Sequence, residues 1–164
     1  MSRFDLALLL LRLTVGITLM AHGYNKFKGG LAGTERWFES IGVRPGRLHA
    51  PLAATTEVSA GFGVAVGALT PLAASGIIAV MVVASIAAHA RNGFFIFRPG
   101  EGWEYVMTLT FCGLLLAVIG PGEWSLDQAI GFDDRPGVRG LLAALVLGAG
   151  GAAALLAAFW RPPP

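Results

Sequence analysis

The sequence predicts an all-α protein, a polytopic bundle of helices that cross a membrane. Hydrophobic residues make up 55% of the 164 residues and charged residues only 13%, whereas soluble domains are about one-quarter charged. The mean hydropathy is +0.67. Five segments are apolar over roughly 20 residues, the length that a bilayer core requires. The chain length suits a single membrane domain covering residues 1–164.

The first predicted span is Leu6–Lys26. A cleaved signal peptide is the alternative, because Arg3 and the small residue Ala21 are compatible with one. However, Asp5 and Arg12 interrupt the apolar core that a signal peptide needs. We therefore predict a retained helix.

The second and third spans come from one long apolar stretch. Residues 58–90 contain no Asp, Glu, Lys or Arg and are too many for one span. Proline disfavours helical geometry in the residue before it and is tolerated in the first turn of a helix. A tight hairpin at Thr70-Pro71 therefore separates two predicted spans, Pro51–Leu69 and Leu72–Arg91.

The last two spans lie on either side of a turn-rich segment. The fourth, Trp103–Ile119, ends at Gly120-Pro121-Gly122. The fifth, Val138–Trp160, is rich in Ala, Leu and Gly and ends before Arg161 and three prolines. Both ends carry the residues that stop helices.

Two of the connecting loops carry membrane-surface signals. The first loop, residues 27–50, contains Glu35-Arg36-Trp37-Phe38, which predicts a short amphipathic helix. The third loop contains the apolar run 94–97, which suits the membrane interface. Tryptophans near predicted span ends are typical of interfacial anchors, and four fall there: Trp37, Trp103, Trp124 and Trp160.

Basic residues near the span ends predict the orientation. Five spans put the N-terminus, the hairpin and the fourth loop on one side, with Arg3, Arg135 and Arg139. Eight basic residues fall on the other side: Lys26, Lys28, Arg36, Arg44, Arg47, Arg91, Arg98 and Arg161. We therefore predict a multi-pass protein of the cell membrane, with the N-terminus outside and the C-terminus in the cytoplasm.

Three ionisable residues, Arg12, Glu57 and Glu104, lie inside or at the rim of separate spans. A charge in hydrocarbon costs roughly 2.5–3.5 kcal/mol on insertion scales, so it usually faces a partner, a cavity or water. Each belongs to a helical stripe that is predicted to face inward. The stripes are Arg12, Gly16, Leu19, Gly23 and Lys26; Glu57, Ala60, Gly61, Val64 and Gly67; and Glu104, Thr108, Phe111, Cys112 and Leu115.

The depths of these residues predict a polar funnel that opens toward the cytoplasm. A rise of about 1.5 Å per residue puts Glu57 roughly 9 Å and Arg12 roughly 20 Å from that boundary. Simpler explanations stay open for three residues: Arg12 as a snorkelling side chain, Lys26 as an interfacial anchor, and Glu104 as a helix-dipole partner. The side chains of Arg12 and Glu57 lean apart, which disfavours a direct salt bridge. Glu57 is the strongest single candidate.

Histidine and cysteine narrow the cofactor classes. An alternative is that His22 and His89, at predicted helix ends, are the two ligands of a haem. His49, in a predicted loop, does not strengthen this alternative. Cys112 is the one cysteine, which excludes an intrachain disulfide or a CxxC relay. We expect no metal site, no intrinsic cofactor and, at a net charge of +2, no nucleic-acid partner.

Several motifs in order resemble the DoxX family of small integral membrane proteins. They are Leu11-Arg12-Leu13, Gly16, His22-Gly23 and Lys26; Glu57, Gly61 and Gly67; and Glu104, Gly120-Pro121-Gly122 and Trp124-Ser125-Leu126-Asp127. The resemblance covers about residues 4–130 and implies a four-helix core, to which the last span adds a fifth helix. Relatives are linked to quinone-coupled sulfur oxidation and to oxidative-stress complexes with soluble sulfurtransferase and superoxide dismutase partners.

The leading hypothesis is a quinone-linked or accessory subunit of a membrane oxidoreductase system, rather than a self-contained enzyme. Arg12, His22, Lys26 and His89 are the candidate ligand-binding residues, and Glu57 and Glu104 the candidate catalytic residues that handle protons. The expected partners are the lipid bilayer, soluble redox enzymes and further copies of the chain. The alternative is a non-catalytic scaffold or lipid-binding protein that recruits soluble partners. A small-solute transporter is disfavoured because the sequence shows no internal repeat.

Overall fold

The computed structural model describes residues 2–132 and 136–163. Every named secondary-structure element within these residues is a helix. This confirms the all-α prediction. The helices are α1 (Arg3–Lys28), α2 (Leu31–Ser40), α3 (Gly46–Val66), α4 (Thr70–Ala84), the π-helix η1 (Ser85–His89), α5 (Glu104–Ile119), α6 (Leu126–Ala129), α7 (Val138–Ala144), the π-helix η2 (Leu145–Ala149) and α8 (Gly150–Phe159).

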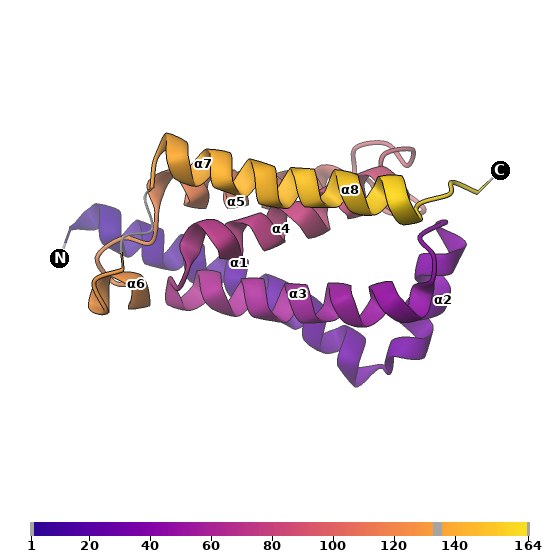
Figure 1. The fold of residues 1–164 in the computed structure, drawn as a ribbon, viewed down its shortest axis with the longest axis horizontal. Helices are drawn as coiled ribbons and strands as arrows, with labels where there is room; N and C mark the ends of the chain where they lie inside the picture. Colours follow the sequence, from indigo (N-terminus) through magenta and orange to yellow (C-terminus); the bar gives the residue numbers. More distant parts are fainter. Residues whose placement is uncertain (1, 133–135, 164) are drawn as a thin grey trace.

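Helix α4 is central to the bundle. It packs against α3, against α5 and against the continuous rod formed by α7, η2 and α8 (Figure 1). Helix α1 packs mainly along α3. The N-terminus and α6 lie at one end of the bundle, the α6 end, while α2 and the C-terminus lie at the other, the α2 end.

Three helical segments are long and apolar enough to cross a membrane: Arg3–Lys28, Thr70–His89 and Val138–Phe159. They correspond to the first, third and fifth predicted spans. Helix α5, with 16 residues, is a shorter apolar helix over the fourth. Helix α3 has 21 residues but is less apolar, because it includes Arg47, His49 and Glu57. Five membrane crossings therefore stay a prediction.

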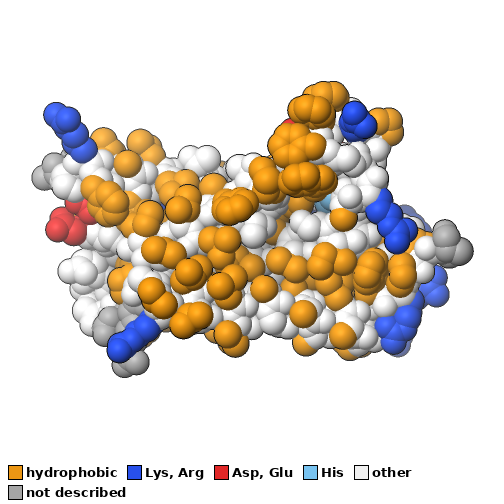
Figure 2. All heavy atoms as spheres, turned by 90° about the horizontal axis from the view of Figure 1, so that it is seen from above, with side chains coloured by type: hydrophobic (Ala, Val, Ile, Leu, Met, Phe, Trp, Pro, Cys, Tyr) orange, Lys and Arg blue, Asp and Glu red, His pale blue; other side chains and the backbone are white. Residues whose placement is uncertain are grey.

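The outer surface of the bundle is apolar over its middle. Large side chains such as Ile17, Phe62, Leu72 and Phe111 are more than half exposed. Figure 2 shows hydrophobic side chains spread along one face, with Lys and Arg at the two ends. This distribution suits a protein whose middle is covered by lipid rather than by water.

The first loop differs from its prediction at one boundary. Helix α2 confirms a short helix within residues 27–50, but α3 begins at Gly46 and continues through Pro51. A proline inside a helix forfeits one backbone hydrogen bond, and here that loss does not end the helix. His49 is consequently a helical residue, which corrects its assignment to a loop.

The predicted hairpin at Thr70-Pro71 is confirmed. Gly67 takes the left-handed conformation, with φ of +67°, and α4 begins at Thr70. Asp127, only 1% exposed, caps this helix start by accepting hydrogen bonds from the backbone nitrogens of Leu69 (2.9 Å) and Thr70 (3.2 Å). The segment after α5 is thereby tied to the hairpin at the α6 end. Arg135, used above to predict the orientation, lies outside the described residues.

Two of the three predicted inward stripes are confirmed. Arg12, Gly16, Leu19 and Gly23 of α1 are buried, as are Glu57, Ala60, Gly61 and Val64 of α3. The stripe predicted for α5 is wrong, because Phe111 is 59% and Leu115 51% exposed. Helix α5 is apolar on all sides, so the pattern of its residues does not distinguish a lipid-facing side from a core-facing side.

Candidate functional site

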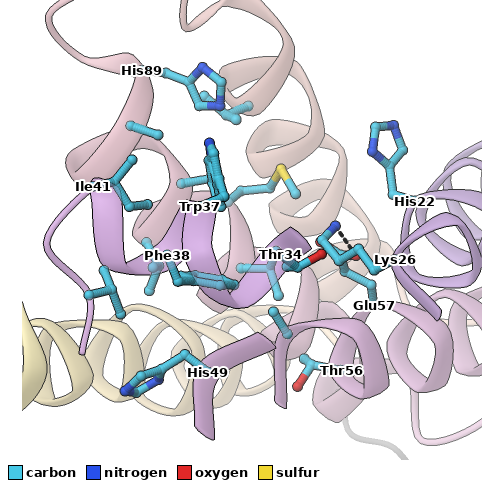
Figure 3. Close-up of a pocket in the computed structure, with 18 of the residues that line it drawn as sticks. His22, Lys26, Thr34, Trp37, Phe38, Ile41, His49, Thr56, Glu57 and His89 are labelled. Carbon is cyan, nitrogen blue, oxygen red and sulfur yellow. Dashed lines mark hydrogen bonds and ion pairs between the residues drawn. The ribbon is translucent and has the colours of Figure 1, made fainter. Parts of the chain in front are cut away.

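A cavity of about 1260 Å³ occupies the α2 end of the bundle. Side chains of α1, α2, α3, α4, η1, α5 and α8 and of the loop before α5 line it, most of them apolar (Figure 3). Larger polar side chains also reach it: His22, Lys26, Trp37, His49, Glu57, His89 and Tyr105. The combination of an apolar wall and a few polar groups is typical of ligand pockets.

Glu57 and Lys26 form an ion pair in this cavity. The Nζ atom of Lys26, in the last turn of α1, lies 2.5 Å from Oε2 of Glu57 on α3. Glu57 is 5% exposed. A buried carboxylate needs a partner, and the partner of Glu57 is Lys26. From the sequence, Arg12, water and a ligand were all open as partners of Glu57.

His22 and Tyr105 form the part of the cavity next to this pair. Their ring centroids are 5.3 Å apart. The Tyr105 hydroxyl is buried and has no hydrogen-bond partner among the described residues. Tyr105 is not among the site residues predicted from the sequence; a tyrosine at the rim of a span is usually an interfacial anchor.

His89 and Trp37 lie on another side of the cavity (Figure 3). Nδ1 of His89, at the end of η1, is 2.9 Å from the Glu101 carbonyl oxygen. That carbonyl can only accept, so Nδ1 is the donor in this contact. Trp37 comes from α2, lines the cavity and is 42% exposed, so its interfacial role stays a prediction.

His49 is a buried histidine of α3 that is not among the site residues predicted from the sequence. It is 2% exposed and lines the cavity on the side of α8. Its ring packs edge-on against Phe159, with centroids 4.9 Å apart. The backbone carbonyl of Arg44 lies near the ring, but neither ring nitrogen makes a hydrogen bond of ordinary geometry with the described residues.

The cavity brings together four of the six predicted site residues: His22, Lys26, Glu57 and His89. Glu104 lines a separate depression of about 350 Å³ together with Phe94, Ile96, Tyr105 and Thr108. Arg12 lines neither space. The predicted funnel therefore has Glu57 within it, but Arg12 is not its floor.

Arg12 instead connects three segments at the α6 end. Its guanidinium donates hydrogen bonds to the carbonyl oxygens of Pro121, of Trp124 (2.5 Å) and of Ala65 (3.5 Å). It is 2% exposed. A planar group with five donors suits several carbonyl acceptors at once.

Within residues 2–132 and 136–163, no group of three or more His, Cys, Asp or Glu side chains could hold a metal ion. The polar groups of the cavity are hydrogen-bonding groups. They offer donors from Lys26 and Tyr105, and donors or acceptors from three histidines.

The chain is similar to known membrane proteins over most of its length. The DoxX family model matches residues 7–90. The inner membrane protein YqjF of Escherichia coli is 30% identical over 129 residues, covering 77% of this chain and 93% of that protein. The membrane protein Rv3486 of Mycobacterium tuberculosis is 32% identical, covering 73% of this chain and 78% of that protein. No solved structure shows significant similarity. The chain thus belongs to the DoxX family of membrane proteins.

Proposed function

We propose that this protein binds a quinone in the cavity at the α2 end and serves as the membrane subunit of an oxidoreductase system. The observation that supports the proposal is an apolar cavity whose buried polar groups include a hydroxyl, that of Tyr105, without a partner in the described part of the chain. A quinone combines an apolar ring and tail with carbonyl oxygens that accept hydrogen bonds. The cavity offers donors for those oxygens.

Tyr105 and Lys26 are the proposed donors to one quinone carbonyl. The Tyr105 hydroxyl has no acceptor among the described residues, and the Lys26 ammonium has three N–H groups, of which Glu57 accepts one. His22, beside the Tyr105 ring, is placed to contact the same head group. A donor that is already buried and unpaired gains a hydrogen bond on binding without losing one to water.

Glu57 is the proposed proton-handling group. When bound, a quinone supplies the redox chemistry, because its reduction takes up two electrons and two protons. The carboxylate of Glu57 accepts a hydrogen bond from Lys26, so a proton can pass between this pair and a ligand held by Lys26. The electrons are proposed to come from a soluble redox enzyme.

We also propose that the α2 end faces the cytoplasm. The eight basic residues assigned to that side come from the loops and termini that gather at the α2 end, whereas Arg3 and Arg139 belong to segments at the α6 end. This asymmetry supports an external N-terminus by the positive-inside rule. A cytoplasmic enzyme would then be on the same side of the membrane as the cavity.

Replacing Tyr105 by Phe tests the quinone site. Tyr105→Phe removes a hydroxyl that has no partner among the described residues, so folding should be unaffected, while the affinity for decylubiquinone should fall about five- to tenfold. The measurement is equilibrium binding to the purified protein in lipid nanodiscs, corrected for partitioning into empty nanodiscs. The matched control is Tyr24→Phe, since Tyr24 is 63% exposed and should leave the affinity unchanged. Absence of saturable binding to the wild-type protein would refute the proposal.

Replacing each glutamate by glutamine tests the proton-handling group. In membranes that contain the protein and its reductant, Glu57→Gln should slow quinone reduction at least about a hundredfold. A general acid or base usually contributes a rate factor of this size. Glu104→Gln is the control, because Glu104 lies outside the cavity. Equal rates for wild type and Glu57→Gln, together with weaker assembly of the variant, would favour the alternative of a non-catalytic, lipid-binding scaffold.

A further inference from the structure

We propose that the cavity contains a second polar site at His49, which binds a hydrogen-bonding group on the chain of an amphiphilic ligand. The inference rests on the proposed function, since it takes the ligand head to lie at Lys26 and Tyr105. It adds the chemical class of the ligand: a molecule with a polar head and a hydroxyl or carbonyl oxygen farther along its chain.

The residues around His49 explain why a ring is buried at this position, but they do not explain why that ring carries two polar nitrogens. Phe159 lies 4.9 Å away and Phe38 6.3 Å away, centroid to centroid, so the imidazole is packed between aromatic side chains. Both nitrogens are nevertheless buried, and neither makes a hydrogen bond of ordinary geometry with the described residues, although the Arg44 backbone carbonyl lies near the ring. A phenylalanine would fill the same apolar space without leaving two polar atoms unpaired. The imidazole therefore suits a partner that enters the cavity.

The position of His49 sets the spacing between the two polar sites. His49 and Glu57 are eight residues apart on α3, which is about 12 Å along a helix. Both line the same cavity, with His49 on the far side from His22 and Lys26 in Figure 3. A single ring does not cover this distance, whereas a ring with an extended chain of roughly ten carbons does.

The size of the cavity agrees with a ligand of this length. Its volume of about 1260 Å³ exceeds the range of about 300–1,000 Å³ that is usual for drug-sized molecules. The wall between the two polar sites is apolar, with Ala53 of α3 and Phe38 of α2 among its residues. A quinone with a plain hydrocarbon tail would cover His49 but leave it unpaired.

The test compares two probes that differ by one hydroxyl. Decylubiquinone carries a plain ten-carbon chain, and its 10-hydroxydecyl analogue carries the same chain with a terminal hydroxyl. Binding of each is measured with the full-length protein in lipid nanodiscs and corrected for its partitioning into empty nanodiscs. The wild-type protein should bind the hydroxylated probe about five- to tenfold more tightly, the effect of one neutral hydrogen bond.

His49→Phe should abolish this preference while retaining binding of both probes. The ratio of the two affinities is taken within one protein sample, so a smaller folded fraction of the variant does not alter it. His22→Phe is the matched control, because it changes another cavity histidine and should weaken both probes equally. Equal wild-type affinities for the two probes, or a preference that survives in His49→Phe, would overturn the inference. Failure of both probes to bind would instead refute the proposed quinone site.

Discussion

Arg12 and Lys26 lie on the same stripe of α1 but have different partners. Lys26 is paired with the carboxylate of Glu57 inside the cavity, at 2.5 Å. Arg12 donates only to backbone carbonyls among the described residues and is buried at the α6 end. Removal of one partner from a buried pair leaves an uncompensated charge, whereas removal of Arg12 leaves unpaired carbonyl oxygens. The first change should affect the ligand site, and the second should affect stability.

Substitution of Arg12 by methionine tests its structural role. Arg12→Met should lower the free energy of unfolding by about 1–3 kcal/mol, because buried carbonyl acceptors at the α6 end lose their donor. Binding of decylubiquinone by the folded protein should stay at the wild-type value. Thermal unfolding in detergent and the nanodisc binding assay supply the two readouts.

The control for this variant is Arg3→Met, the same substitution at an exposed position of the same helix. Its effect should stay within about 0.5 kcal/mol. A stable Arg12→Met variant that had lost quinone binding would contradict the structural role and return Arg12 to the ligand site.

At the scale of elements, α1 and α3 approach each other through glycines. A Cβ atom on Gly61 would lie 2.6 Å from the Gly16 carbonyl oxygen, and a Cβ on Gly16 would lie 2.5 Å from that of Gly61. Small residues at such positions allow two helix backbones to come close inside a membrane. This close approach brings the last turn of α1, with Lys26, beside Glu57 of α3.

Adding one methyl group at this contact should separate the two helices. Gly61→Ala is expected to destabilise the protein by about 1–3 kcal/mol, the usual cost of overpacking, and to lengthen the Lys26–Glu57 contact. Gly150→Ala is the control, because a Cβ at Gly150 of α8 would meet nothing within 4 Å. Alanine there should be neutral or stabilising, because glycine is a poor helix former. A Gly61→Ala variant as stable as wild type would show that the glycine contact does not limit the packing.

At the scale of the whole molecule, the two ends of the bundle are built differently. The α6 end is closed by backbone and carboxylate contacts, among them the Asp127 cap on α4. The α2 end holds the cavity, and there the C-terminus of α8 joins the loop before α3 through the hydrogen bond from the Arg44 nitrogen to the Phe159 carbonyl (3.0 Å).

Cysteine labelling tests which end faces the cytoplasm. In a Cys112→Ala background, cysteines are placed singly at Gln128, exposed at the α6 end, and at Ser40, exposed at the α2 end. In right-side-out membrane vesicles, an impermeant maleimide should label the Gln128→Cys protein, and should label the Ser40→Cys protein only after the vesicles are opened. The reverse pattern would overturn the proposed orientation, and labelling of both would show that the two positions are not on opposite sides.

Much of the helical framework could be predicted because it depends on local properties of the chain. The hairpin follows from Pro71, and the end of α5 from Gly120-Pro121-Gly122, since these residues limit the backbone wherever they occur. The inward faces of α1 and α3 follow from small residues that recur at helical spacing. Glu57 could be selected for the same reason, as a charge on such a face.

Contacts between distant segments were decided only by the tertiary structure. A helix that is apolar on all sides does not reveal which side meets lipid, so the outward direction of Phe111 in α5 could not be predicted. Two contacts join residues that are far apart in sequence: Glu57 with Lys26, and Arg12 with Trp124. The burial of His49 likewise depends on segments distant from it in the chain. The sequence by itself determined the long helices and two of the buried charges, Arg12 and Glu57. The partner of each charge depends on how closely the helices pack, which is a property of the assembled bundle.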